Sequence, residues 1–244
     1  MIHQPEHIRQ TADHLFRHES GKMIAVLSRL LGMQQWETAQ DIVQDTLLQA
    51  MHTWSYNGLP ANPAAWLMKA AKNRAIDLLR RQSRFNQISP EYAGLLQSQS
   101  ELEPAIDQLF LDHEIRDSQL RMIFACCHPV IPHESQVALT LKTLCGLSNA
   151  EIARAFLCPE ETIAKRIYRA KEKINAAQIR LQVPQGAALT ERLDGVLNTL
   201  YLLFNEGYNS SHPEQLIRED LCAVSMRLCH PLTETREPYP PATR

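Results

Sequence analysis

The sequence predicts an all-α protein built from small helical modules, and three observations support this class. Glycine is scarce, with 8 residues in 244. Alanine, leucine, glutamine, arginine and glutamate recur with few β-branched runs, a composition that favours helices over strands. Apolar residues also return at helical spacing in several segments. This length allows one large domain or two to three small ones.

The clearest helix is predicted over residues 39–54. Its inward stripe consists of Ile42, Val43, Thr46, Leu47, Ala50, Met51 and Trp54. The opposite face consists of Asp41, Gln44, Asp45, Leu48 and His52. From the residues alone, this second face is equally well explained as a solvated surface or as a binding surface.

The next helix is predicted to begin at Pro63 and to be strongly basic. The preceding segment, SYNGLPANPAAW, contains helix-breaking residues, and Asn62 has the position of an N-cap. The stretch from Trp66 to Arg84 contains six cations and a single acid, Asp77. These cations are Lys69, Lys72, Arg74, Arg80, Arg81 and Arg84. We expect Asp77 to pair with Arg74, Arg80 or Arg81, and we expect Trp54 and Trp66 to belong to the core.

The charge then reverses over Ser98 to Asp117, where Arg116 is the only cation. The acids in this stretch are Glu101, Glu103, Asp107, Asp112, Glu114 and Asp117. Together with Pro90 and Pro104, this pattern predicts an acidic linker that returns to helix near Ala105. Basic and acidic blocks therefore cancel in the net charge of -2.

Two further helices are predicted within GLSNAEIARAFLCPEETIAKRIYRAKEKI. Ser148 and Glu151 have capping-box spacing, and Pro159 suits the first position of the second helix. The residues of that helix predicted to face the core are Ile163, Ile167, Ala170 and Ile174. Those predicted to face outward are Glu161, Thr162, Lys165, Arg166, Arg169 and Lys173. Two helices with the cations on the second are typical of a helix-turn-helix, whose second helix enters the major groove of DNA. From the residues alone, the alternative is an ordinary α-helical hairpin with a solvated face.

Other classes of site have weak support in the sequence. No run of 18 apolar residues and no signal peptide is present, so we expect a cytoplasmic protein without membrane contact. Cys126, Cys127, His128 and His133 lack the spacing of a zinc site, and the six cysteines are expected to be free. No nucleophile-base pair, P-loop or dinucleotide turn is recognisable, so we expect no catalytic residue, no metal, no cofactor and no enzymatic activity.

The order of AQDIVQDTLLQAMHTW, NPAAWLMKAAKNRAIDLLRR, the acidic stretch and the helix-turn-helix resembles the extracytoplasmic-function (ECF) sigma factors of the sigma-70 superfamily. FACCHPVIPHESQVALTLKTLCGLS and LNTLYLLFNEGYNSSHPEQLIREDLCA resemble the branch with a C-terminal helical extension. The resemblance implies sigma region 2 over residues 8–88, a linker over 89–118, sigma region 4 over 119–183 and a partial extension over 184–244. It also implies transcription initiation by a DNA-binding, non-enzymatic partner of RNA polymerase.

The resemblance implies roles for the residues described above. The face of Asp41, Gln44, Asp45, Leu48 and His52 would bind core RNA polymerase. The minus-ten strand would be bound single-stranded by the turn and the basic helix. The residues implied are Asn57, Gly58, Leu59, Asn62, Lys69, Lys72, Asn73, Arg74, Arg80, Arg81 and Arg84. Duplex DNA of the minus-thirty-five element would be read by Glu161, Thr162, Lys165, Arg166, Arg169 and Lys173, and the acidic linker would thread through the polymerase.

Members of the extended branch continue further as a helical-repeat-like domain, whereas this sequence stops at RLCHPLTETREPYPPATR. We therefore expect a truncated extension with a disordered tail. The resemblance implies that the extension, rather than a dedicated anti-sigma factor, controls activity. Two alternatives remain open. One is a free-standing helix-turn-helix regulator of duplex DNA, and the other is a truncated, inactive sigma remnant.

Overall fold

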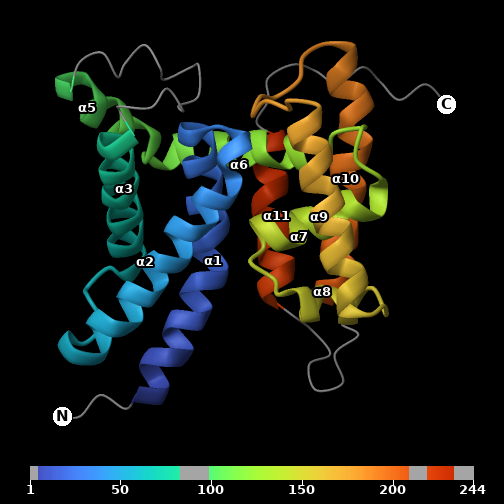
Figure 1. The fold of residues 1–244 in the computed structure, drawn as a ribbon. Helices are drawn as coiled ribbons and strands as arrows, with labels where there is room; N and C mark the ends of the chain where they lie inside the picture. Colours follow the sequence, from blue (N-terminus) through green and yellow to red (C-terminus); the bar gives the residue numbers. More distant parts are fainter. Residues whose placement is uncertain (1–4, 83–98, 209–218, 234–244) are drawn as a thin grey trace.

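A computed structural model describes residues 5–82, 99–208 and 219–233, and all regular structure in these ranges is helical (Figure 1). The expected all-α class is therefore confirmed. None of the helices in these ranges is both long and apolar enough to cross a bilayer. The tail that was expected to be disordered lies outside the described residues after position 233.

The first module contains α1 (Pro5–Leu31), a short 3-10 helix η1 (Met33–Gln35), α2 (Trp36–Asn57) and α3 (Pro63–Gln82). Gly32 turns the chain after α1 with a φ of 94°, a conformation that favours glycine. The Asn62 side chain accepts a hydrogen bond from the Ala65 N–H at 3.0 Å. This bond confirms Asn62 as the cap of α3, and it fixes where the basic helix begins.

The acidic stretch is helical over most of its described residues. It forms α5 (Gln99–Leu109) and the first turns of α6 (Asp112–Cys126), so helix begins at Gln99 and not near Ala105 as expected. Pro104 lies inside α5. Acidic residues stabilise the first turns of helices because they interact with the N-terminal end of the helix dipole, which explains why α6 begins at Asp112.

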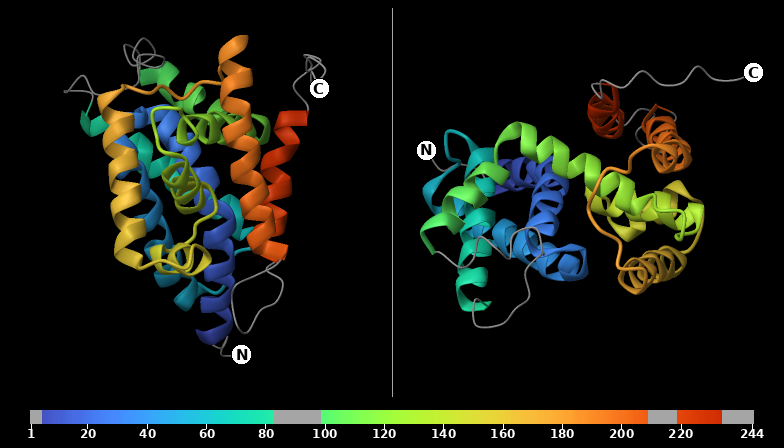
Figure 2. Two further views of the ribbon diagram at one scale, coloured as in Figure 1. Left: turned by 90° about the vertical axis from the view of Figure 1, so that its right-hand side faces the viewer. Right: turned by 90° about the horizontal axis from the view of Figure 1, so that it is seen from above.

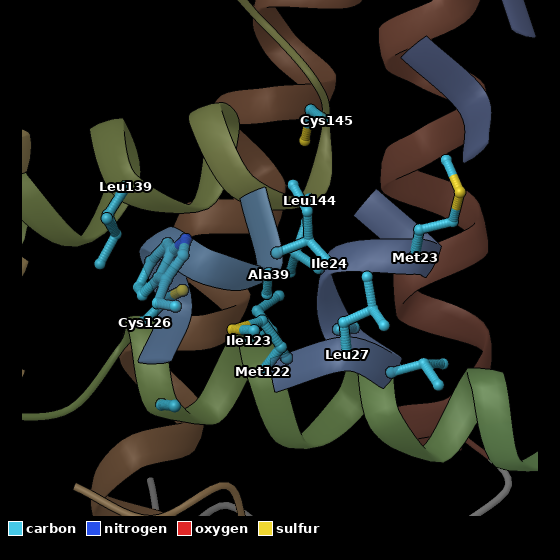
Figure 3. Close-up of a cluster of buried hydrophobic side chains, with 14 of the residues drawn as sticks. Met23, Ile24, Leu27, Ala39, Met122, Ile123, Cys126, Leu139, Leu144 and Cys145 are labelled. Atoms are coloured by element: carbon cyan, nitrogen blue, oxygen red, sulfur yellow. The ribbon is translucent and has the colours of Figure 1, made fainter. Parts of the chain in front are cut away.

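The second module contains α7 (His133–Leu144), α8 (Asn149–Ala155) and α9 (Glu160–Ala176), and α6 runs from the first module into it (Figure 2). Leu27 of α1 lies beside Met122 and Ile123 of α6, and Ile24 of α1 lies beside Leu144 of α7 (Figure 3). Each fully buried aliphatic side chain stabilises the fold by about 1.5–3 kcal/mol. The two modules therefore share one continuous core.

Gly21 shows how closely the modules approach. A Cβ atom at this position of α1 would lie 2.2 Å from the carbonyl oxygen of Leu144, at the end of α7. Such a distance is sterically forbidden, and a backbone oxygen cannot move aside as a flexible side chain can. Only glycine allows this contact between α1 and α7.

The extension forms a helical hairpin of α10 (Ala187–Tyr208) and α11 (Glu219–Thr233), which packs on α6 and α7. The Ser225 hydroxyl of α11 donates to the Leu200 carbonyl of α10 at 2.9 Å. The Thr199 hydroxyl lies 3.6 Å from the Cys127 sulfur at the end of α6. The two helices of the extension therefore dock on the second module and do not stand alone.

Candidate functional site

The predicted polar face of α2 is exposed along its length. Asp41, Gln44, Asp45 and His52 are all exposed, and the Leu48 side chain retains 64% of its accessible surface. On the other side, the predicted inward stripe is buried or half-buried. An exposed leucine between carboxylates offers both an apolar contact and negative charge to a partner.

The turn between α2 and α3 holds polar groups at the surface. Gly58 caps α2 with a φ of 76°, and its N–H donates to the Trp54 carbonyl at 2.9 Å. Asn57 and Asn62 are exposed, whereas Gly58 and Leu59 are half-buried. Below the turn, Trp54 and Trp66 meet edge to face with ring centroids 5.5 Å apart. Trp54 is buried and Trp66 is half-buried against the core, so both tryptophans support the turn from within.

Several cations of α3 are already paired with acids of the same chain. Lys72 binds Asp107 at 2.8 Å, and Arg80 binds Glu103, both on α5. Arg74 lies 3.3 Å from Asp45 on α2 and also donates to Gln49 at 3.0 Å. The acidic α5 thus lies along the basic helix.

The remaining predicted residues of α3 differ in their surroundings. Lys69, Asn73 and Arg81 are exposed, and Arg84 lies outside the described residues.

The expected pair of Asp77 with a neighbouring arginine is wrong. Arg74 and Arg80 turn to acids on other helices, and Asp77 has no ion pair within the described ranges. Contacts between helices therefore replaced the contacts within α3 that the sequence suggested.

The two helices of the predicted helix-turn-helix are α8 and α9. The Ser148 hydroxyl accepts from the Glu151 N–H at 3.1 Å and the Glu151 carboxylate accepts from the Ser148 N–H at 2.8 Å, so the capping box is confirmed. The turn passes through Leu157, whose φ is 49°. Pro159 is the N-cap and not the first residue, so α9 begins one residue later than expected.

The outward side of α9 carries the predicted cations. Ile163, Ile167, Ala170 and Ile174 are buried as expected. Glu161, Lys165, Arg169 and Lys173 are exposed, while Thr162 and Arg166 are half-buried. Lys165 binds Glu161 at 2.7 Å, one turn earlier in the same helix, and Arg166 binds Glu134 of α7. Arg169 has no ion pair within the described residues.

Polar contacts join the two modules through residues that sequence reasoning missed. Arg29 of α1, which is 9% exposed, binds Glu114 at 2.7 Å and Asp117 at 3.0 Å on α6. Arg17 of α1 binds Glu151 at 2.9 Å. An arginine inside the apolar run MIAVLSRLL was the available signal for a buried partner, because a charge in such a position requires one.

Lys171 of α9 adds a contact to the first module. Its Nζ lies 5.5 Å from the centroid of the Trp36 ring and donates to Gln40 at 3.0 Å. It also lies 3.7 Å from Glu37. Burial lowers the pKa of the neighbouring Lys142, and the positive charge of Lys171 lowers it further. The basic character of α9 is therefore divided between a side that holds α2 and a side that faces solvent.

The cysteines do not form a reactive or metal-binding cluster in the described part of the chain. None of the six forms a disulfide bond; Cys126, Cys127 and Cys145 are buried and the others are half-buried. Burial raises the pKa of Cys127 to about 11, against partial opposition from hydrogen bonds with Thr199 and Thr140. Its thiolate is therefore scarce at neutral pH. Within the described ranges, no three residues of the metal-ligating types converge.

Comparison with known protein families gives three matches. Residues 15–85 match Sigma-70 region 2, and residues 121–174 match Sigma-70, region 4. Residues 192–243 match a family of unknown function, DUF6596, which covers most of α10 and α11.

Comparison with individual proteins gives the same picture, although no solved structure matches. An uncharacterised protein of Rhizobium meliloti is 38% identical over 79% of this chain, and the match covers 45% of that protein. The ECF RNA polymerase sigma-E factors of Salmonella typhimurium and Escherichia coli K12 are each 32% identical over 145 residues, which is 55% of this chain and 71% of theirs. With regions 2 and 4 in this order, on α1–α3 and α6–α9, the chain belongs to the ECF family of sigma-70 factors.

Proposed function

We propose that this chain binds core RNA polymerase, recognises the minus-thirty-five and minus-ten elements of promoter DNA and helps to open the promoter for transcription. One observation carries the proposal. Two modules with a shared core each present a cationic helix, and the helix that precedes the first of these exposes carboxylates around a leucine. Three surfaces of different character suit three contacts with the transcription machinery.

In the proposed complex, α9 enters the major groove at the minus-thirty-five element. A groove about 12 Å wide admits one helix, and outward arginines can contact guanine edges while lysines neutralise phosphates. Arg169 is available at once within the described structure. Arg166 must exchange Glu134 for DNA, and Lys165 must exchange Glu161.

The proposed minus-ten site combines the turn at Asn57 to Asn62 with the cations of α3. Extrusion of one base from the nontemplate strand costs a few kcal/mol. Polar groups exposed at the turn could receive the base, and Lys69 and Arg81 could hold adjacent phosphates. Lys72 and Arg80 become available when Asp107 and Glu103 release them.

The proposed polymerase contact is the α2 face of Asp41, Gln44, Asp45, Leu48 and His52. Its negative charge suits a basic partner surface, and Leu48 supplies an apolar centre for the contact. A partner of this kind places the chain in the cytoplasm, where RNA polymerase acts.

Regulation through the extension is also part of the proposal. α10 and α11 pack on α6 and α7, so a change in the extension would act on the module that carries α9. A thermal melt that compares the full chain with residues 1–184 distinguishes a regulatory extension from the end of an inactive remnant. If the chain is an inactive remnant, the extension will contribute nothing to the melting temperature or to promoter binding.

A free-standing regulator is the second candidate, because α8 and α9 alone form a helix-turn-helix. The two functions differ in their partner. We expect the chain to co-purify with core polymerase and to shift promoter DNA only in its presence. Sequence-specific binding of duplex DNA by the chain alone, without any affinity for core polymerase, would favour the regulator instead.

A further inference from the structure

A basic cavity of about 640 Å³ lies among α1, α3, α6 and α11, four helices that are far apart in the sequence. Five cationic side chains line it, together with the carboxylates of Glu19 and Asp112. The cations are Lys22, Lys69, Lys72, Arg116 and Arg227. The extension contributes Arg227, which lies outside the matches to sigma regions 2 and 4.

Two of the five cations form ion pairs with carboxylates of the protein, and the other three do not within the described residues. Lys22 binds Glu19 at 2.7 Å, and Lys72 binds Asp107 at 2.8 Å. Lys69, Arg116 and Arg227 have no ion pair within the described residues.

The strongest observation concerns buried donors that lack an acceptor. The Nε and Nη2 atoms of Arg227 are buried without a hydrogen-bond partner. The same is true of the amide nitrogen of Gln119, a residue that is 3% exposed and also lines the cavity. A buried donor without an acceptor is costly, and a guanidinium more so than an amide. Although two carboxylates line the cavity, these particular donors therefore lack an oxygen-rich, negatively charged acceptor.

The lining also indicates the chemical class of that group. A phosphate accepts several hydrogen bonds at once and matches the forked donors of arginine. Met68, Phe110 and Ile115 supply an apolar part of the wall, against which a ring can lie. The volume falls within the range of small-molecule sites, roughly 300–1,000 Å³.

We propose that this cavity binds a phosphate ester, held by Arg227, Arg116, Lys69 and Gln119. The ester can be a free nucleotide or a phosphate of the DNA strand that follows α3. Only the second source rests on the proposed function. In either case, α11 of the extension contributes a phosphate-binding side chain to a site whose opposite wall is the basic helix α3.

Thermal unfolding of the full chain without polymerase tests the site, with inorganic phosphate and ATP as probes at constant ionic strength. The variant is Arg227→Gln, and the control is Arg180→Gln, which removes the same charge from an exposed position outside the cavity. We expect both probes to raise the melting temperature of the wild type and the control but not of Arg227→Gln. Without a probe, Arg227→Gln should melt at or above the wild-type temperature, because it removes buried unpaired donors. A purely structural Arg227 would lower it.

A labelled oligothymidylate distinguishes the two sources of phosphate. If the oligonucleotide and ATP compete, and Arg227→Gln weakens both at least tenfold, the strand occupies the site. If Arg227→Gln weakens ATP alone, the source is a free ester. Equal binding of both probes by Arg227→Gln and Arg180→Gln would overturn the proposal, as would the absence of binding to the wild type. Gln119→Leu provides a second variant with the same expected loss, should Arg227→Gln fail to fold. Failure to bind core polymerase would refute the proposed function and leave these measurements unaffected.

Discussion

The basic helices α3 and α9 carry similar charge in the sequence but differ in how the folded chain uses it. On α3, acids from other helices bind Lys72, Arg74 and Arg80. On α9, Lys165 is paired within its own helix and Arg166 is paired with Glu134 of α7, whereas Arg169 is exposed and has no ion pair in the described structure. The charge of a sequence segment therefore does not equal the charge that a ligand meets.

The pairs on α3 are suited to exchange. Their side chains are partly or largely exposed, with Asp107 at 59% and Arg80 at 51%. Exposed pairs of this kind contribute only about 0–1 kcal/mol each and weaken in salt. DNA phosphates can therefore displace the acids of α5, which partly cover the proposed minus-ten site in the free protein. On α9, Arg169 is already available, while Lys165 and Arg166 must release Glu161 and Glu134.

The largest expected effect comes from Gly21→Ala, which breaks the packing that holds the module of α3 beside that of α9. The new Cβ would meet the Leu144 carbonyl at 2.2 Å, so the helices must separate. We expect a loss of about 3 kcal/mol in the free energy of unfolding, measured by urea denaturation. Gly195→Ala in α10 is the control, because its Cβ would lie 3.2 Å from the Gln136 side chain and helix propensity offsets that contact. Equal stability of the two variants would contradict the close approach of α1 and α7.

The next largest effect is expected for Arg166→Ala, which tests the proposed DNA-reading surface of α9 at a half-buried residue. If Arg166 contacts a guanine edge, discrimination between minus-thirty-five sequences should fall by about 1–3 kcal/mol. The measurement is competition between promoter variants for the complex with core polymerase, with Arg180→Ala as the control. Equal weakening on every sequence would make Arg166 a phosphate contact and not a reader of bases.

Asp45→Lys acts where the proposed polymerase face meets α3. It places a cation in the acidic face and beside Arg74, which now lies 3.3 Å from Asp45. We expect affinity for core polymerase to fall by about tenfold, with little change in stability because the side chain is 61% exposed. Asp194→Lys, an exposed charge reversal on α10, should have no effect on this affinity. Unchanged co-purification of Asp45→Lys with core would count against the assigned face.

The smallest expected change in stability comes from Glu103→Gln combined with Asp107→Asn. These substitutions remove the acids that pair with Arg80 and Lys72 of α3, and they leave the pairs of α9 unchanged. The free energy of unfolding should change by less than about 1 kcal/mol. Affinity for a single-stranded oligonucleotide should rise severalfold and depend more steeply on salt, because two cations become available to phosphates. Glu134→Gln is the matched variant for α9, where we expect tighter binding of duplex promoter DNA by the complex with core polymerase and unchanged binding of the single strand. If neither variant changes binding, the intramolecular pairs do not compete with DNA.

Features that depend on neighbouring residues were predictable from the sequence. The inward stripes of α2 and α9, the Asn62 cap and the Ser148 capping box follow from spacing within one helix. The exposed faces proposed to bind polymerase and the minus-thirty-five element follow for the same reason.

Features that depend on packing between distant segments were not predictable. Asp77 was expected to pair locally, but the arginines near it turn to Asp45 and Glu103 once α2 and α5 pack on α3. The start of α5 was missed because proline and polar residues predicted a linker, whereas contacts with α3 favour a helix there. The Arg29 pairs and the cavity beside Arg227 likewise require helices that only the fold brings together.

Run-off transcription with core polymerase, with and without this chain, tests most directly whether the chain recognises promoters for the polymerase. Mapping the RNA 5′ ends across a whole genome finds the start sites without any promoter having to be chosen as a template. If α9 and the turn with α3 recognise promoter DNA, new start sites will share two upstream sequence blocks at a fixed spacing, one for α9 and one for the turn and α3. An unchanged set of start sites, together with no binding of the chain to core polymerase, would contradict it.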